Sequence, residues 1–338
     1  MNKEAIQTYR QSTLTRILSL TVTGLLVIVF FLVDLFVGSA DITFLDTLKA
    51  IFIPDHVEPS VSIIIRQLRI PISLMAILIG ISLGTSGSVM QTILENPLAS
   101  PYTLGIGAGA SFGATIAIFL GLNDYLVALL AFVFAMTISL FIYLLGRFKD
   151  ITTHTMTLLG IALLFLFKAL QAFLQYFLSE EANQSIVFWE FGSLQKVDYQ
   201  KLLILLVALL IVLPLLFRNS WKYTALSLGS IKAESMGIHT SRLKLESFFL
   251  ISVISSLAVC FTGPIGFIGI ASPHMAKISV GEDHRFYMPL SGLLGAFILL
   301  FADILSKVIF KGSVFPIGII TSLIGVPFFF TILLKERH

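Results

Sequence analysis

The sequence places a lysine where positive charge is costly. Lys168 lies inside an apolar stretch that runs from about Thr152 to Leu178, and Gln171 and Gln175 follow it. At helical spacing the three side chains share one face. A lysine near the middle of a membrane helix costs about 2.5–3.5 kcal/mol on insertion scales, so it needs an acidic partner or a wet cavity. Two alternatives stay open: an ion pair with a buried acid on another helix, or a place on a solute path.

Other polar residues do not combine into a catalytic set or a metal site. Glu282, Asp283 and His284 are consecutive rather than spaced along one helix face, which favours a solvated turn. The glycine-rich run from Gly105 to Ser111 lacks the Lys-Ser or Lys-Thr pair of a phosphate-binding loop, so we interpret it as close helix packing. The single cysteine, Cys260, excludes an internal disulfide. We expect no cofactor, no metal and no enzyme activity in this chain, and any ATP is used by a partner.

The composition is that of a membrane protein. Of the 338 residues, 57% are hydrophobic and 12% are charged, and the mean hydropathy is +0.96. A soluble domain is about 45–50% apolar and about 25% charged. The net charge of +3 lies mostly in loops, which favours contact with membrane lipid and not with nucleic acid.

The apolar runs predict an all-α polytopic protein with about ten transmembrane helices in one permease domain, residues 1–338. Basic residues precede the first run, which is too long for the core of a cleavable signal peptide. The loop charges place both termini in the cytoplasm. The expected spans are 17–37, 72–90, one from 104, 125–145, 152–178, 201–217, 245–262, a short broken one at 263–274, 289–309 and 316–334.

One polar stretch, Trp221 to Lys244, interrupts these runs. Gly229 and Gly237 break its helical pattern, which predicts two short helices at about residues 221–240 with a bend between them. Its basic residues outnumber its acids and place it on the cytoplasmic side. A folded cytoplasmic element on an otherwise buried protein is a docking surface. The apolar residues at helical spacing are Leu226, Leu228, Ile231 and Met236.

Three further features concern the outer and inner ends of the spans. The polar segment from Ser179 to Gln200 predicts a short interfacial helix. Gly263 to His274 predicts a helix broken by Gly and Pro, which is tolerated at membrane depth only against protein or a wet cavity. Asp303 and Lys307 are four residues apart on one predicted helix, so they can pair.

Short motifs spread from residue 66 to the end resemble the FecCD family of permeases, which belong to type II ABC importers for iron–siderophore complexes, haem and vitamin B12. Each motif is weak alone, and their order and spacing together are specific. They are Arg66-Gln-Leu-Arg-Ile-Pro71, Gly87-Ser-Val-Met-Gln91, Asn96-Pro-Leu-Ala99, Leu228-Gly229 with Met236-Gly237, Gly263 to Gly269 with Pro273-His274, Asp283-His-Arg285, Ala302-Asp303, and Pro316-Ile-Gly318 with Gly325-Val-Pro-Phe328.

The resemblance implies a vitamin-B12-permease-like fold in a bacterial plasma (inner) membrane. It implies a second permease subunit, identical or paralogous, two ATPase subunits below and an extracytoplasmic substrate-binding protein above. It assigns roles to several residues. ATPase coupling through the two short helices is assigned to Leu228, Gly229, Ser230, Ala233, Glu234, Met236 and Gly237; binding-protein docking to Arg66, Arg69 and Lys307; and the cytoplasmic gate to Thr153 and His154, beside the possible path residues Lys168, Gln171 and Gln175.

The expected function is therefore that of a permease subunit moving an iron–siderophore complex into the cytoplasm. Haem and cobalamin are the alternative cargoes. A gradient-driven secondary transporter is a competing class, but such proteins usually show paired broken helices in both halves, and the sequence shows one clearly broken segment.

Overall fold

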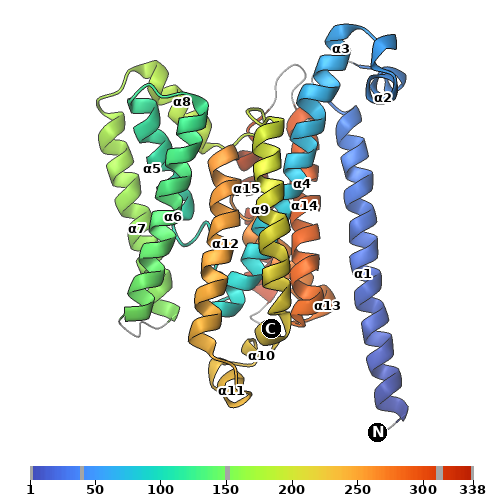
Figure 1. Cartoon of the computed structure of the whole chain (residues 1–338), viewed down its shortest axis with the longest axis vertical. Helices are drawn as coiled ribbons and strands as arrows, with labels where there is room; N and C mark the ends of the chain where they lie inside the picture. The colour runs from blue at the N-terminus through green and yellow to red at the C-terminus, as the bar shows by residue number, and fades with distance from the viewer. Residues whose placement is uncertain (1–2, 39–41, 149–152, 310–314, 336–338) are drawn as a thin grey trace.

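The computed structural model describes residues 3–38, 42–148, 153–309 and 315–335 (Figure 1). Within these ranges the chain forms helices and connecting turns, with no strand. The helices are α1 (Lys3–Phe36), α2 (Phe44–Phe52), η1 (Pro54–His56), α3 (Pro59–Ile63), η2 (Ile64–Arg69), α4 (Ile70–Ile93), α5 (Ile106–Phe119), α6 (Asp124–Phe148), α7 (Thr153–Gln175), α8 (Glu180–Glu190), α9 (Tyr199–Arg218), α10 (Ser220–Leu226), α11 (Ser230–Ser235), α12 (Thr240–Thr262), α13 (Ile268–Val280), α14 (His284–Val308) and α15 (Ile317–Lys335).

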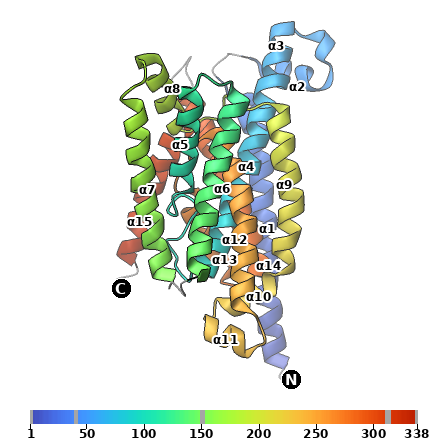
Figure 2. The same cartoon turned by 60° about the vertical axis from the view of Figure 1, so that its left-hand side comes forward.

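The predicted membrane architecture is confirmed. Among the described residues, seven helices are long and apolar enough to cross a membrane, in the segments α1, α3–α4, α6, α7, α9, α12 and α14. The three remaining predicted spans coincide with the shorter helices α5, α13 and α15. The long helices run side by side along one axis in both views (Figures 1 and 2). Their outward faces carry exposed leucine, valine and phenylalanine, as a lipid-facing surface requires.

Helix α4 lies at the centre of the bundle, and small residues bring its neighbours close. A Cβ at Gly80 would collide with the backbone of α14 at Ala296, and a Cβ at Gly84 would collide with the carbonyl of Ser291. Gly113 of α5 meets α6 in the same way at Leu130. These approaches are expected in lipid, where close packing holds helices together. Gly109, inside the predicted glycine-rich run, meets α6 at Ile138, which confirms that this run contributes to close packing.

The predicted broken span is only partly broken. Gly263 ends α12 with a φ of +76°, residues 263–267 run without helix, and Phe267 has a φ of +65°. Helix α13 then begins at Ile268 and continues through Pro273, which was predicted to belong to the interruption. The irregular backbone therefore covers fewer residues than the Gly and Pro pattern indicates.

The two ends of the bundle differ. Helices α2, α3 and α8 lie at one end, and α10, α11 and the first turns of α1 lie at the other (Figures 1 and 2). The predicted short helix is present as α8, whose N-cap Ser179 accepts from the Ala182 amide, and its interfacial position stays a prediction. The end with α8 is called the outer end below, and the end with α11 the inner end.

Candidate functional site

The inner end carries the two short helices that the polar stretch predicts. Helix α10 and helix α11 are separated by Gly229, whose φ of +105° and ψ of 147° only glycine adopts readily. No heavy atom lies within 4 Å of a Cβ built at Gly229, so a side chain would meet no steric clash there. Glycine is required by the backbone dihedral angles alone. Gly237 follows α11 with a φ of +82°. The bend predicted from the two glycines is therefore present.

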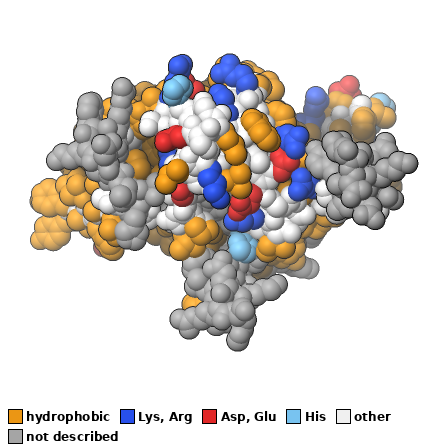
Figure 3. Space-filling view, turned by 90° about the horizontal axis from the view of Figure 1, so that it is seen from below, with side chains coloured by type: hydrophobic (Ala, Val, Ile, Leu, Met, Phe, Trp, Pro, Cys, Tyr) orange, Lys and Arg blue, Asp and Glu red, His pale blue; other side chains and the backbone are white. Residues whose placement is uncertain are grey.

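These two helices expose an apolar and basic surface, the coupling surface. Its apolar members are widely exposed, from 53% for Leu228 to 86% for Ile231, and Lys222 and Lys232 lie beside them. Figure 3 shows charged and apolar side chains mixed over this end of the molecule. An exposed apolar patch rimmed by charge is typical of a protein–protein interface. The coupling surface comprises Trp221, Lys222, Leu228, Ile231, Lys232, Glu234 and Met236.

Two of the predicted coupling residues, Ala233 and Glu234, make contacts within the protein. Ala233 is fully buried, so it seats α11 on the body of the protein. Glu234 accepts a hydrogen bond of 2.5 Å from the Thr240 hydroxyl at the start of α12. Tyr223, which the sequence analysis did not single out, anchors α10 with its hydroxyl 2.7 Å from Ser247 Oγ, and burial raises its pKa to about 12.

A second residue that sequence reasoning missed is Glu95, at the end of α4. The helix ends in a Schellman turn, in which the amides of Glu95 and Asn96 donate to the carbonyls of Thr92 and Gln91. Glu95 occupies the left-handed position with a φ of +48°, where glycine is usual and another residue costs roughly 1–2 kcal/mol. The only signal in the sequence is a glutamate at a helix end where glycine is usual, and that signal is visible only once the turn is known.

The carboxylate of Glu95 reaches two other elements. It accepts a hydrogen bond from Ser230 of α11 and pairs with Lys244 of α12 at 3.0 Å. Burial alone raises the pKa of Glu95, but the hydrogen bonds from Ser230 and Lys244 and the lysine charge outweigh it and lower the pKa below its ordinary value. The negative charge is therefore held in place at the junction of α4, α11 and α12.

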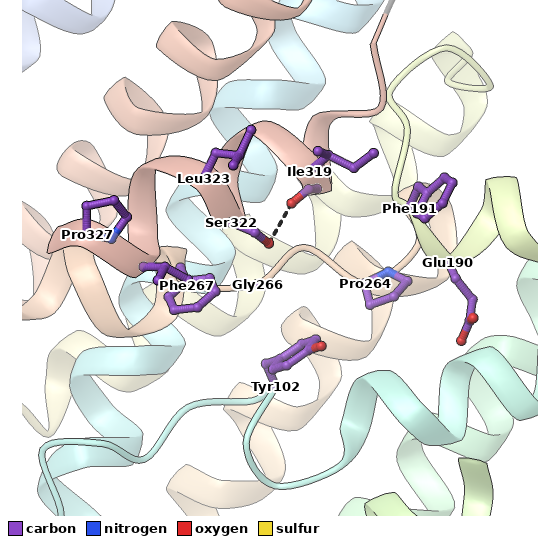
Figure 4. A pocket seen from close by; sticks show the side chains of 12 residues that line it. Tyr102, Glu190, Phe191, Pro264, Gly266, Phe267, Ile319, Ser322, Leu323 and Pro327 are labelled. Carbon is purple, nitrogen blue, oxygen red and sulfur yellow. Dashed lines mark hydrogen bonds between the residues drawn. The ribbon is translucent and has the colours of Figure 1, made fainter. Parts of the chain in front are cut away.

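A cavity of about 520 Å³ opens on the side of the bundle, between the end of α8, the irregular segment 263–267 and α15. Backbone hydrogen bonds join these parts: the Ser193 amide donates to Thr262, and the amides of Ile317 and Gly318 donate to Gly192 and Phe191. The lining is mostly apolar and aromatic, and Glu190 is its one charged member among the described residues. Figure 4 shows Tyr102, Phe191 and Phe267 around the opening, with the Ser322 hydroxyl bonded to the Gly318 carbonyl at 2.7 Å.

The cavity gives Lys168 its environment. The ammonium of Lys168 on α7 pairs with the carboxylate of Glu190, which lines the cavity. An acidic partner on another helix is thus present, but it is not the buried acid of the prediction, since 24% of the Glu190 side chain and 47% of the Lys168 side chain are exposed. Gln171 is buried and Gln175 is half-buried, so the three predicted path residues share a helix face but not one environment. Thr153 and His154 begin α7, and their side chains lie outside the described part of the chain.

Two of the three predicted docking residues lie inside the protein. Lys307 is buried between Asp34 of α1, at 2.8 Å, and Asp303 of its own helix, at 2.6 Å. Arg69 is also buried and donates to the carbonyls of Leu35 and Phe36 at the end of α1. The expected pairing of Asp303 with Lys307 is confirmed. Arg69 and Lys307 are therefore buried in this conformation, and their role in docking stays a prediction.

Arg66 differs from these two. It is exposed at the outer end, and its carbonyl accepts a hydrogen bond of 2.5 Å from the Tyr199 hydroxyl. The turn from Glu282 to His284 is only partly solvated, as predicted for Glu282 but not for His284, which is fully buried. Glu282 pairs with Lys277, and Asp283 caps α14 and pairs with Arg285 and Arg16. Within the described residues no group of three metal-ligating side chains occurs.

Comparison with known proteins identifies the family. The model of the FecCD transport family matches residues 25–335. The chain belongs to the FecCD transport family. It is therefore an ABC transporter permease that lies within a membrane.

Relatives within the FecCD family differ in the cargo that their names state. The chain is 31% identical to the Fe(3+)-citrate import system permease protein YfmD of Bacillus subtilis, over 95% of this chain and 96% of that one. It is 33% identical to the molybdate import system permease protein MolB of Haemophilus influenzae, over 84% of each chain. Among solved structures, a metal-chelate type ABC transporter in an inward-facing conformation matches 94% of this chain and 98% of that one, with a TM-score of 0.82 and 31% identity.

Proposed function

We propose that this FecCD permease is the transmembrane subunit of an ATP-driven importer that carries an iron–siderophore complex from a binding protein to the cytoplasm. The observation that carries the proposal is the coupling surface. It is an exposed, partly apolar element at the inner end of a chain whose sequence has no nucleotide-binding motif. Such an element suits a separate ATPase that docks there and drives the permease.

The side cavity supports a transport path shared between two permease subunits. It opens laterally from the bundle, its lining is mostly apolar, and irregular backbone at membrane depth requires a protein or water neighbour. A second permease subunit facing it, identical or paralogous, would close the opening. The N-terminus would then lie in the cytoplasm, since the first turns of α1 are at the same end as the coupling surface, and we propose the same side for the C-terminus (Figure 2).

The proposed cargo is supported by the names of relatives. A relative is named for ferric citrate and the solved structure is described as metal-chelate type. The one charged lining residue, Glu190, is paired with Lys168, so the pair adds no net charge at the cavity edge and does not distinguish between anionic and neutral chelates. The test is uptake by the permease, reconstituted with its ATPase and binding protein, of iron–siderophore complexes, ferric citrate, hemin, cobalamin and molybdate. ATP-dependent uptake of hemin, cobalamin or molybdate alone would contradict the iron–siderophore cargo.

Docking of the binding protein is proposed for Arg66 alone. An exposed guanidinium on a rigid backbone suits a carboxylate on the partner. Replacing Arg66→Glu should lower the affinity for the binding protein about tenfold or more, because a favourable charge contact becomes a repulsive one. Binding is measured on the purified complex in detergent. Lys49→Glu, which reverses an exposed charge on α2 at the same end, is the control. Equal affinities of the two variants would show that Arg66 is not a docking residue.

A further inference from the structure

The Glu95 junction joins the coupling surface to the wall of the side cavity. On one side, Ser230 is the first residue of α11, and Lys244 is on the helix that follows it. The ammonium of Lys244 lies 3.0 Å from Glu95 and 3.0 Å from Ser230 Oγ, so the three side chains contact one another. On the other side, Glu95 begins the connection that leads to Tyr102, which lines the cavity.

The polar contact of Glu95 lies beside a second cavity, of about 220 Å³, between the end of α4, the end of α10 and the turn between α13 and α14. Across that cavity the end of α4 is joined to α14 by Thr92 and His284, whose side chains are 2.8 Å apart. The link from α11 to the end of α4 is a different one: Ser230 donates to Glu95, and Lys244 bonds to both. Displacement of α11 therefore acts on the end of α4 through Glu95.

The connection from Glu95 to Gly105 is stiff enough to pass the displacement on. The Asn96 side chain accepts from the Leu98 amide at 2.9 Å and contacts the Thr157 hydroxyl of α7 at 3.3 Å. Ser100 and Thr103 bond to each other through backbone and side chain. Gly105, with a φ of +79°, then approaches the Gly160 carbonyl of α7. Movement at Glu95 thus reaches Tyr102 in the cavity and α7, which carries Lys168.

We propose that Glu95 is a positioning residue for transport, which couples α11 to the cavity wall through Ser230 and Lys244. The proposal rests on the proposed function, in which an ATPase docks on the coupling surface. When α11 moves, the carboxylate pulls the connection that bears Tyr102, and the cavity changes shape. ATP hydrolysis and transport stay linked only while this contact holds.

The experiment measures cargo transported per ATP hydrolysed by the complete complex in proteoliposomes. Glu95→Gln keeps the size of the side chain and removes its charge, and we expect the ratio to fall about fivefold or more, the scale of a typical coupling between sites. Glu95→Gly should cause the same loss. Because glycine suits the left-handed position, the turn itself is not weakened in that variant. The exchanged pair, Glu95→Lys with Lys244→Glu, should recover most of the ratio.

The matched control is Glu246→Gln. Glu246 pairs with Arg242 at 2.7 Å, an ion pair within α12 that bridges no other element. Its loss should leave the ratio unchanged. Wild-type ratios for both Glu95→Gln and Glu95→Gly would overturn the proposal, and so would an exchanged pair as uncoupled as the single variants. A wild-type complex that hydrolyses ATP but carries none of the cargoes would instead overturn the proposed function.

Discussion

Single charged residues are used in two ways in this protein. At the surface, pairs such as Lys196 with Asp124 remain in contact with water. Inside, Asp34, Asp303 and Lys307 gather where α1 and α14 meet, and Ser73 of α4 donates to Asp34 at 2.5 Å. Removing charge from water is costly, and only close partners offset the cost. This buried group of charges therefore holds α1, α4 and α14 together at the outer end of the bundle.

The buried group predicts a large effect from a single replacement. Lys307→Met leaves two carboxylates together without their cation, and breaking a buried pair in this way costs about 3–5 kcal/mol. The measurement is the free energy of unfolding of the purified permease in detergent. Asp124→Asn, which breaks a pair whose side chains are both more than 60% exposed, should cost under about 1 kcal/mol. Similar losses in the two variants would show that the buried group is not structural.

The role of a residue was predictable where its partner is close to it along the sequence. The spacing of Asp303 and Lys307 gave their pairing correctly. Asp34 is 273 residues away from Lys307, and no local pattern indicates that contact. The same holds for Lys168, whose partner Glu190 lies on a different helix. The docking role of Lys307 came from the family resemblance, and the sequence did not show that the fold places Asp34 beside it as well as Asp303.

Secondary-structure elements are fixed here by glycines as much as by apolar runs. The apolar runs located the long helices, because a span needs about 20 apolar residues and this length is visible in the sequence. The two short helices and their bend were also predictable, since glycine pairs mark left-handed turns. The Schellman turn at Glu95 was not, because it carries glutamate where glycine is usual. The extent of the break at 263–267 was overestimated because Pro273 fits inside α13.

Helix α11 offers a test of the bend. Gly229→Ala forces alanine into a backbone region that is costly for residues with a Cβ, by about 1–3 kcal/mol. The strain should reorient α11 and weaken ATPase binding about tenfold or more, since each 1.4 kcal/mol changes an equilibrium tenfold. Affinity for the purified ATPase subunit is the readout. Gly24→Ala lies in α1, where a Cβ meets nothing within 4 Å, so it should bind normally. Normal binding by Gly229→Ala would contradict a role of the bend in docking.

At the scale of the whole molecule, the three proposed tasks of coupling, transport and docking would be separated along one axis. The coupling surface is at the inner end, Arg66 is at the outer end, and the side cavity lies between them. The sequence predicted this sidedness from charge and composition. It did not predict the cavity, because its lining comes from the connection before α5, the end of α8, the segment after α12, and α15. Only the tertiary fold brings these parts together.

The cavity is distinguishable from a lipid-filled groove by cysteine labelling. Leu323 lines the cavity on α15 and is 67% exposed, and Leu210 of α9 is 65% exposed and is not among the lining residues. Each is changed to cysteine in a Cys260→Ala background, which removes the only native thiol. A thiolate forms in water and not in lipid, so a charged thiol reagent should label residue 323 about tenfold or more faster than residue 210. The assembled complex in lipid is used, so that a second subunit, and not detergent, closes the opening. Equal rates would mean that lipid fills the cavity, and the path would then lie elsewhere.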